Sequence, residues 1–222
     1  MEQTSQLDEL YKNKDADYYG CERSELLGFI PAAAHSVLDV GCGEGSFGNL
    51  LKTARNCEVW GIEPTEAARA ASGVLDRVIE GELFAGLNEI GDKRFDAVCF
   101  NDVLEHMPAP HDALRRIKTN LSADGCVVAS IPNVLYFPVI EQLLLRQDWK
   151  YEKFGVLDDT HLRFFTKKSI VRMFEDCGYR VEKIAGLNPM SGGRKYRVLN
   201  TILMNYMADW KYLQFAVVAK VV

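Results

Sequence analysis

Val37-Leu-Asp-Val-Gly-Cys-Gly-Glu-Gly-Ser-Phe-Gly48 is the stretch that decides the fold of this 222-residue chain. It begins with a short apolar run, Val37 to Val40, that is typical of a buried strand. Glycines follow at positions 41, 43, 45 and 48, and a helical apolar pattern starts at Phe47. Glycine allows positive φ angles and lets a ligand approach the backbone without a Cβ in the way. Together these features predict the start of a nucleotide-binding α/β unit.

The glycines are compatible with two kinds of nucleotide site. Gly43, Gly45 and Gly48 satisfy G-x-G-x-x-G, so a dinucleotide such as NAD must be considered. Asp39 lies two residues before the first glycine, where a carboxylate suits a cationic ligand better than a pyrophosphate. Glu63 ends the next apolar run and can accept hydrogen bonds from both ribose hydroxyls there. A nucleoside that carries positive charge, S-adenosylmethionine above all, satisfies both acidic residues.

Three segments resemble parts of class I S-adenosylmethionine-dependent methyltransferases. Asp39 to Gly45 looks like the first motif of that class. Asn101 to Met107 and Asp159 to Thr166 resemble a bacterial branch often found beside glycosyltransferases in surface-polysaccharide pathways. The resemblance runs from about Tyr18 to Val181. It implies a Rossmann-like fold, S-adenosyl-L-methionine as the cofactor, and a role in polysaccharide biosynthesis.

Strand and helix patterns alternate along the chain and predict an α/β fold, a doubly wound, seven-stranded, mostly parallel sheet. The resemblance implies that the last strand, Phe215 to Ala219, inserts antiparallel beside Arg180 to Ile184. We expect a single methyltransferase domain over residues 1–222. Within it, residues 1–17 form a polar N-terminal segment, and residues 133–165 form a small helical cap over the acceptor.

Three helices have recognisable boundaries in the sequence. Thr65 is a plausible N-cap of an alanine-rich helix that reaches Ala71, and Thr166 of a helix that Gly178 stops. A third, amphipathic helix is predicted from Val198 to Met207, after a basic loop.

Cofactor-binding residues are expected at the carboxyl ends of the strands, where open α/β sheets bind ligands. By the resemblance, Glu82 meets the adenine amino group, although the class more often has Asp there; the alternative is a solvated loop carboxylate. Tyr18 or Tyr19 could line the same pocket or simply pack an N-terminal helix. The expected set is Asp39, Gly41, Cys42, Gly43, Gly45, Glu63, Pro64, Glu82, Asn101, Asp102 and Val103.

Two histidines and an arginine are the expected catalytic residues on the acceptor side. Transfer to a hydroxyl requires a general base, or a hydrogen bond that makes the oxygen more nucleophilic. His106 follows the fourth strand, and His161 precedes a capped helix with Arg163 two residues on. Each has a structural alternative: His106 could pin its own loop, and His161 could pack the cap onto the core. In that alternative, Arg163 pairs with Asp158 or Asp159.

The favoured function is methyl transfer from S-adenosylmethionine to a small-molecule or sugar-like acceptor, at a hydroxyl. An inactive cofactor-binding scaffold that serves a partner glycosyltransferase is the alternative. We expect no metal site, although Asp102, Asp158 and Asp159 could converge on a divalent cation.

Composition is ordinary for a globular protein, at 48% hydrophobic and 26% charged residues. The net charge of −5 lacks the basic footprint of nucleic-acid binding. Six cysteines without C-x-x-C spacing predict buried thiols in a reducing compartment. The first ten residues do not resemble a signal peptide, and no apolar run is long enough to span a membrane. We therefore expect a cytoplasmic protein without nucleic-acid or membrane partners.

Overall fold

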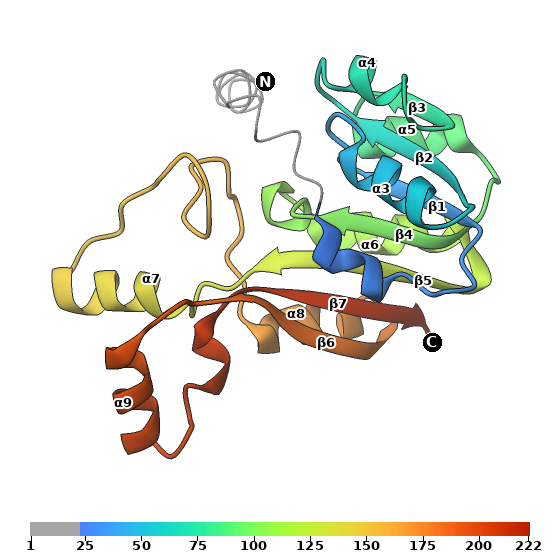
Figure 1. Cartoon of the computed structure of the whole chain (residues 1–222). Helices are drawn as coiled ribbons and strands as arrows, with labels where there is room; N and C mark the ends of the chain where they lie inside the picture. Colours follow the sequence, from blue (N-terminus) through green and yellow to red (C-terminus); the bar gives the residue numbers. More distant parts are fainter. Residues whose placement is uncertain (1–22) are drawn as a thin grey trace.

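The computed structural model of the chain describes residues 23–222, so Tyr18, Tyr19 and the polar segment 1–17 lie outside the described residues (Figure 1). One seven-stranded sheet runs through the described part in the order β3-β2-β1-β4-β5-β7-β6. Strand β7 is antiparallel to β5 and β6, and the other neighbours are parallel. This arrangement confirms the predicted sheet, including the antiparallel last strand. The strands are β1 (Ser36–Val40), β2 (Glu58–Glu63), β3 (Arg77–Glu80), β4 (Phe95–Asn101), β5 (Leu121–Pro132), β6 (Tyr179–Pro189) and β7 (Tyr212–Val221).

Helices cover both faces of the sheet (Figure 1). Buried residues of α5, α6 and α8 form the core on one face, and those of η1 and α3 form the core on the other. The helical segments on the sheet are η1 (Ser24–Phe29), α3 (Ser46–Ala54), α4 (Ala68–Ala71), α5 (Leu83–Ile90), η2 (Leu104–His106), α6 (Pro110–Ile117), η3 (Lys118–Asn120) and α8 (Lys167–Asp176). The remaining segments are α7 (Phe137–Glu141), η4 (Gln142–Arg146), α9 (Arg194–Ile202) and η5 (Ala208–Lys211).

The central strands are apolar on both faces because both faces are covered. In β1, Leu38 and Val40 pack with one core and Val37 with the other. Asp39 is the exception, a carboxylate that is only 1% exposed inside this strand. A buried charge in a central strand is costly unless it serves a ligand or a partner. The exception therefore marks the end of β1 as a functional position.

Two predicted helix boundaries differ from the structure. The helix expected to start at Thr65 covers only Ala68–Ala71. The Thr65 hydroxyl does accept from the Ala67 amide at 3.3 Å, as an N-cap would, and it donates to Glu63 at 2.6 Å. The helix expected over residues 198–207 is α9, Arg194–Ile202. Gly193 precedes it at φ 60°, and positive φ at Met204 and Asn205 stops the chain from continuing as a helix.

The predicted helix N-cap of α8, Thr166, is confirmed. The Thr166 hydroxyl accepts a hydrogen bond from the Ser169 amide at 3.2 Å, and the Ser169 hydroxyl accepts one from the Thr166 amide at 2.8 Å. This reciprocal pair satisfies two amides that the helix itself leaves without partners. It also fixes the point at which the cap insertion ends and the domain core resumes.

The five cysteines in the described part of the chain are buried and make no disulfide, as expected for buried thiols. Burial raises the pKa of each of these thiols, so they behave as small apolar side chains. No described helix has both the length and the apolar character needed to cross a bilayer.

Candidate functional site

The glycine turn after β1 needs glycine for two separate reasons. Gly41, Gly43 and Gly45 have φ angles of 70°, 53° and 83°, a region that side chains disfavour. A Cβ on Gly41 would also lie 2.7 Å from Cγ2 of Val103, which packs across the turn. Both findings support the predicted cradle, in which a ligand reaches the backbone directly.

Glu63 ends β2 and holds the glycine turn. One carboxylate oxygen accepts a hydrogen bond from the Gly43 amide at 2.9 Å, and the other accepts from the amide and hydroxyl of Thr65 at 3.0 and 2.6 Å. A carboxylate has about four lone-pair sites, so these three bonds leave capacity for a ribose hydroxyl. The ribose contact stays a prediction, and bracing of the turn is a second role that the sequence did not reveal.

Asp39 and Asn101 form a buried polar pair on the neighbouring strand ends. The Asn101 amide lies 3.4 Å from Oδ1 of Asp39, and Asn101 Oδ1 has no hydrogen-bond partner among the described residues. Burial, followed by the nearby Glu63 carboxylate, raises the pKa of Asp39 to about 7. Among the described residues, Asn101 Oδ1 is unsatisfied and the one donor to the Asp39 carboxylate is the Asn101 amide at 3.4 Å, so the pair fits a ligand that brings N–H groups and positive charge. The amino group of S-adenosylmethionine has that chemistry.

The other predicted cofactor residues lie around the same turn in different environments. Cys42 is buried beneath the glycines, whereas Pro64 and Glu82 are exposed. Glu82 directly precedes α5 and its side chain does not cap that helix. Its contact with adenine remains a prediction.

Asp102 is held by a network that the sequence did not indicate. Its φ angle is 55°, and its amide and carboxylate both contact the Ser130 hydroxyl, at 3.1 and 3.0 Å. Arg23 completes the network with an ion pair to Asp102 and a 3.1 Å hydrogen bond to the same hydroxyl. The network ties the start of the described chain to the ends of β4 and β5.

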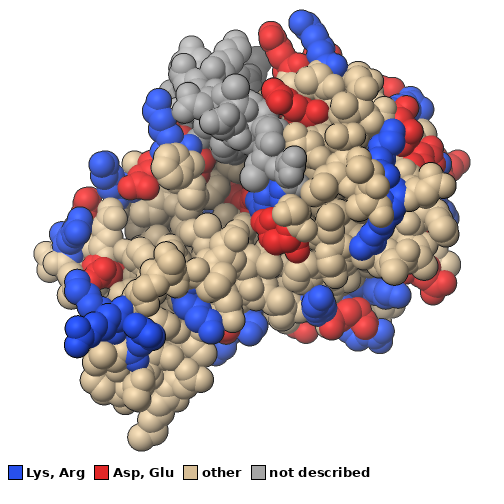
Figure 2. Space-filling model, in the orientation of Figure 1, with Lys and Arg blue, Asp and Glu red and all other residues tan. Residues whose placement is uncertain are grey.

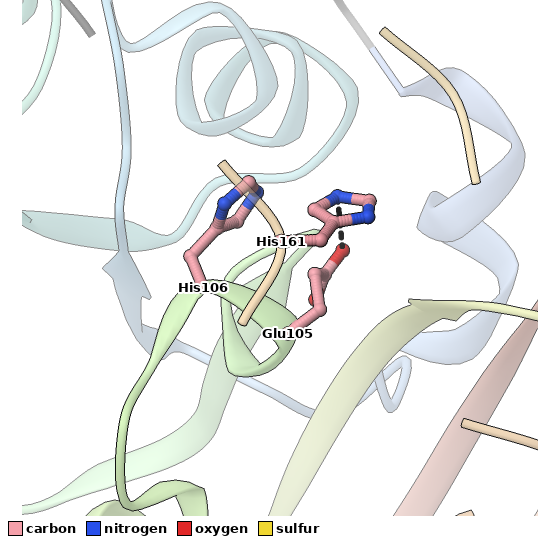
Figure 3. A group of neighbouring side chains, drawn as sticks. All are labelled: Glu105, His106 and His161. Atoms are coloured by element: carbon pink, nitrogen blue, oxygen red, sulfur yellow. Dashed lines mark ion pairs between the residues drawn. The ribbon is translucent and has the colours of Figure 1, made fainter. Parts of the chain in front are cut away.

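In the region predicted to bind the acceptor, three side chains converge just beyond β4 (Figure 3). Glu105 and His106 come from η2, and His161 comes from the end of the cap insertion. The two imidazole rings meet edge to face with centroids 4.7 Å apart. His161 is 8% exposed, whereas His106 is half-buried. The structure thus brings together the two histidines that the sequence had placed 55 positions apart.

A chain of hydrogen bonds sets the tautomer of His106. Thr160 donates its hydroxyl proton to Asp158 at 2.5 Å, so the Thr160 oxygen acts as an acceptor toward His106 Nδ1 at 3.1 Å. The Thr160 carbonyl, also an acceptor, lies 3.2 Å from the same nitrogen. Both contacts require a proton on Nδ1. Neutral His106 therefore carries its lone pair on Nε2, the atom that can take a proton from an acceptor.

Glu105 lies beneath the histidines and is 1% exposed. Neither of its carboxylate oxygens has a hydrogen-bond partner among the described residues. Burial raises the pKa of Glu105 to about 8. Its Oε1 is 4.0 Å from Nε2 of His161, whose Nδ1 lies 3.0 Å from the Val156 carbonyl. A buried, protonatable carboxyl thus faces the inner histidine.

The end of the predicted cap, at residues 162–163, is fastened to the same turn through its backbone. The Glu105 carbonyl accepts hydrogen bonds from the amides of Leu162 and Arg163, at 2.9 and 3.0 Å. The Arg163 side chain is exposed, and its guanidinium donates to the Pro108 carbonyl at 2.6 Å and the Leu162 carbonyl at 3.2 Å. These contacts are those of a brace between cap and core, so the predicted acceptor-binding role of Arg163 gains no support from them.

Donor atoms that could hold a cation converge at Glu105, His106 and His161, where one from each lies within 4.8 Å of the others. The three aspartates considered from the sequence do not form such a group in the described part of the chain. Two of them have other contacts: Asp102 pairs with Arg23, and Asp158 accepts hydrogen bonds from the Thr160 amide and hydroxyl.

Sequence reasoning missed Glu105 and Thr160. Glu105 has the apolar neighbours Val103, Leu104 and Met107, a signal that could have marked it as buried. Thr160 gave no comparable signal, because its role depends on a contact with His106 that only the tertiary fold creates.

Comparisons with known proteins agree with this geometry. A family model described as a methyltransferase domain matches residues 12–184. A ubiquinone biosynthesis O-methyltransferase from Pseudomonas paraeruginosa (strain DSM 24068 / PA7) is 31% identical over 197 residues, which cover 80% of this chain and 78% of that protein. The enzyme of the same name from Aeromonas salmonicida (strain A449) is 26% identical over 186 residues, covering 78% of this chain and 75% of that one.

Solved structures share the fold. A SAM-dependent methyltransferase from Archaeoglobus fulgidus has a TM-score of 0.69 at 21% identity, covering 89% of this chain and 91% of that one. An O-methyltransferase from neocarzinostatin biosynthesis, in complex with S-adenosylmethionine and a naphthoic acid, has a TM-score of 0.59 at 14% identity and covers 90% of this chain and 53% of that one. The chain belongs to the methyltransferase-domain family and is a class I S-adenosylmethionine-dependent methyltransferase.

Proposed function

We propose that the protein methylates a hydroxyl group of a small-molecule acceptor, with His106 as the general base. The observation that carries this proposal is the hydrogen-bond chain from Asp158 through Thr160 to His106. An imidazole whose Nδ1–H donates to acceptors in this way presents Nε2 as a base. A third group, here the Asp158 carboxylate acting through Thr160, fixes the orientation of the ring.

The cofactor supplies a methyl group on a sulfonium, so the leaving group is already activated. The remaining task is to orient the acceptor oxygen and to remove its proton. As the oxygen forms its bond to the methyl carbon, the hydroxyl proton moves to Nε2 of His106, and S-adenosylhomocysteine is the second product. The imidazolium that forms keeps its Nδ1–H bond to Thr160.

His161 and Glu105 support this step from behind. The His161 ring packs edge to face on His106 and fixes its plane. The Glu105 carboxyl is buried nearby and can become negative when positive charge develops on the histidine pair. Cofactor residues from Asp39 to Gly45, with Glu63 and Asn101, lie at the neighbouring strand ends. We propose that these residues would hold the cofactor, which would supply the methyl group.

The acceptor class is supported by the names of the relatives. Those compared above by sequence are O-methyltransferases, which favours oxygen over nitrogen or carbon. A sugar-like acceptor and a place in polysaccharide biosynthesis beside a glycosyltransferase rest on the sequence resemblance alone and stay predictions. Residues 133–165 are proposed to roof the acceptor, because the end of this segment carries His161 and Thr160 to the site.

A methyl-transfer screen tests the proposal. The protein is incubated with S-adenosylmethionine labelled in the methyl group and with catechols, other phenols and nucleotide sugars. Label should enter a hydroxyl of one class, and His106→Ala should abolish most of that incorporation. His35→Ala is the matched control, because His35 is exposed at the opposite end of β1. Incorporation only into amines, or a fully active His106→Ala variant, would contradict the proposal.

A further inference from the structure

Residues 190–211 connect β6 to β7 and project from the body of the molecule; we call them the α9 arm (Figure 1). The arm is anchored at its base by a small apolar cluster of Phe137, Tyr196 and Met207. The rings of Phe137 and Tyr196 meet edge to face at 5.5 Å, and the Tyr196 hydroxyl donates to the Met207 carbonyl at 2.9 Å. Since Phe137 belongs to α7, the arm is packed against the first helix of the cap.

Beyond this anchor, the arm presents apolar side chains to solvent. Met204 is 93% exposed, Tyr206 82% and Ile202 69%. Val198, Leu199 and Leu203 add further exposed apolar surface on the same arm. Contiguous apolar exposure of this kind marks an interaction surface and not an ordinary solvated helix.

The exposure is built into the arm by its backbone. Met204 and Asn205 have φ angles of 49° and 67°. Asn200 ties the turn: its backbone carbonyl accepts from the Asn205 amide, its Oδ1 accepts from the Met207 amide, and its side-chain amide donates to Oδ1 of Asn205. A methionine at positive φ is unfavourable, and such positions are kept where the local geometry has a use. Here the geometry holds the Met204 side chain outward.

Most charges of the α9 arm are positive, although Asp209 near its end pairs with Lys167 and Lys195 pairs with Glu141. Arg194, Lys195 and Arg197 lie in the first turns of α9, and residues 190–208 contain no Asp or Glu. Figure 2 shows blue side chains gathered where α9 begins and a tan tip beyond them. Arg194 and Arg197 line a shallow hollow together with Val198 and Ile202. Cationic and apolar side chains are thus interleaved on a chain whose net charge is −5.

We propose that the α9 arm binds the surface of an anionic lipid bilayer. Apolar side chains flanked by Lys and Arg are the composition of segments that lie in the interface between headgroups and acyl chains. The cations are attracted to anionic headgroups, while Ile202, Met204 and Tyr206 supply the apolar and aromatic contacts. The acidic body is repelled by the same surface, so the complementary charge selects the arm as the point of contact.

The α9 arm is proposed to lie on the surface of the bilayer and not to cross it. The expectation of no membrane partner rested on the lack of a long apolar run, which speaks only to segments that cross the bilayer. The inference does not depend on the identity of the methyl acceptor or on the role of His106.

Co-sedimentation of the full chain with vesicles tests the proposal. Vesicles of phosphatidylcholine alone are compared with vesicles in which about a third of the lipid is phosphatidylglycerol. The protein should sediment with the anionic vesicles, and its partition should fall at least about tenfold in phosphatidylcholine or in high salt. No binding to anionic vesicles, or equal binding to both compositions, overturns the proposal.

Two pairs of substitutions locate the contact. The apolar pair is Ile202→Gln with Met204→Asn, because asparagine tolerates positive φ. The charge pair is Arg194→Gln with Arg197→Gln. Each should lower partition about tenfold or more, whereas Arg115→Gln with Arg180→Gln, exposed arginines on α6 and β6, should not. Circular dichroism checks that each variant is folded.

The alternative partner for the exposed apolar surface of the α9 arm is a second copy of the chain. Size-exclusion chromatography with light scattering, without lipid, measures this directly. A species whose mass does not change with concentration agrees with lipid as the occupant. Self-association that the apolar pair abolishes, or vesicle binding that both pairs leave unchanged, assigns the arm to another partner and refutes the proposal.

Discussion

The hydroxyl oxygen of Thr160 lies 3.1 Å from Nδ1 of His106, and the proton of that hydroxyl is already directed to Asp158. The direction of both hydrogen bonds is therefore fixed, and with it the tautomer of the proposed base. Thr160, from the cap insertion, thus determines which ring nitrogen of His106 in η2 can act as the base.

Thr160→Val tests this relay as a positioning device. Valine has similar volume but cannot accept the bond from Nδ1, so the less useful tautomer becomes populated. We expect turnover to fall about tenfold, with a shifted pH profile and an unchanged Kd for S-adenosylmethionine. Thr160→Ser should restore both turnover and profile. A valine variant with the wild-type profile would show that the hydroxyl has only a packing role.

Glu63→Ala tests the cofactor assignment. Loss of the carboxylate removes three hydrogen bonds that brace the glycine turn and the predicted ribose contact. Binding of S-adenosylmethionine should weaken by about 1–3 kcal/mol in calorimetric titration, the range for hydrogen bonds to a charged group. Glu44→Ala, an exposed carboxylate in the same turn, is the control and should bind normally. Unchanged binding in the Glu63 variant would refute the assignment.

Gly41→Ala tests the cradle. The new methyl group would meet Val103 at 2.7 Å, and alanine at φ 70° is strained. We expect the free energy of unfolding to fall by about 1–3 kcal/mol and cofactor affinity to fall with it. Adding Val103→Ala should recover only part of the stability, because it removes the collision but not the strain. Full recovery in chemical denaturation would mean that the collision alone requires glycine.

Glu105→Gln tests the buried carboxyl through the pH dependence of stability. Burial raises the pKa of Glu105 from 4.5 to about 8, so its contribution to stability is complete below 4.5 and is lost as pH rises through about 8. For one proton, the free energy of unfolding falls by about 1.4 kcal/mol per pH unit across that window. The variant should therefore lose less stability than the wild type between about pH 5 and about pH 9 in urea titrations. Asp39, whose pKa is raised to about 7, acts with the same sign in both proteins. Parallel curves for the two proteins would contradict the buried-carboxyl account.

The fold could be predicted largely from sequence, because it rests on local patterns. The apolar runs of β1 and β4 and the reciprocal cap at Thr166 are readable from neighbouring residues. One predicted helix start differs from the structure: α4 begins at Ala68, after a turn in which the Thr65 hydroxyl donates to Glu63.

In the candidate site, too, contacts within one segment could be predicted, and contacts between distant segments could not. The glycine turn and Asp39 lie within one continuous segment, so their proximity could be predicted from neighbouring residues. The pairing of His106 with Thr160, and of Glu105 with His161, joins residues more than 50 positions apart, so no pattern in the sequence could show it. Arg163 likewise donates to the carbonyls of Leu162 and Pro108, and the second contact spans 55 positions that no local pattern links. Its predicted role toward the acceptor stays a prediction.

Removal of metal tests whether the site works by acid–base chemistry alone. Although Glu105, His106 and His161 converge, the hydrogen bonds of His106 suffice to make it a base. Dialysis against a chelator should leave turnover unchanged within about twofold. Turnover that is lost and then restored by a divalent cation would assign the cluster to a metal.

The rate of methyl transfer by His106→Ala, at saturating cofactor and with an acceptor from the screen, tests the central claim most directly. The account predicts a rate about 10²–10⁴-fold below that of the wild type, with the Kd for S-adenosylmethionine and the unfolding free energy unchanged. A rate equal to that of the wild type, or a loss that merely follows weaker cofactor binding, would contradict the assignment of His106 as the base.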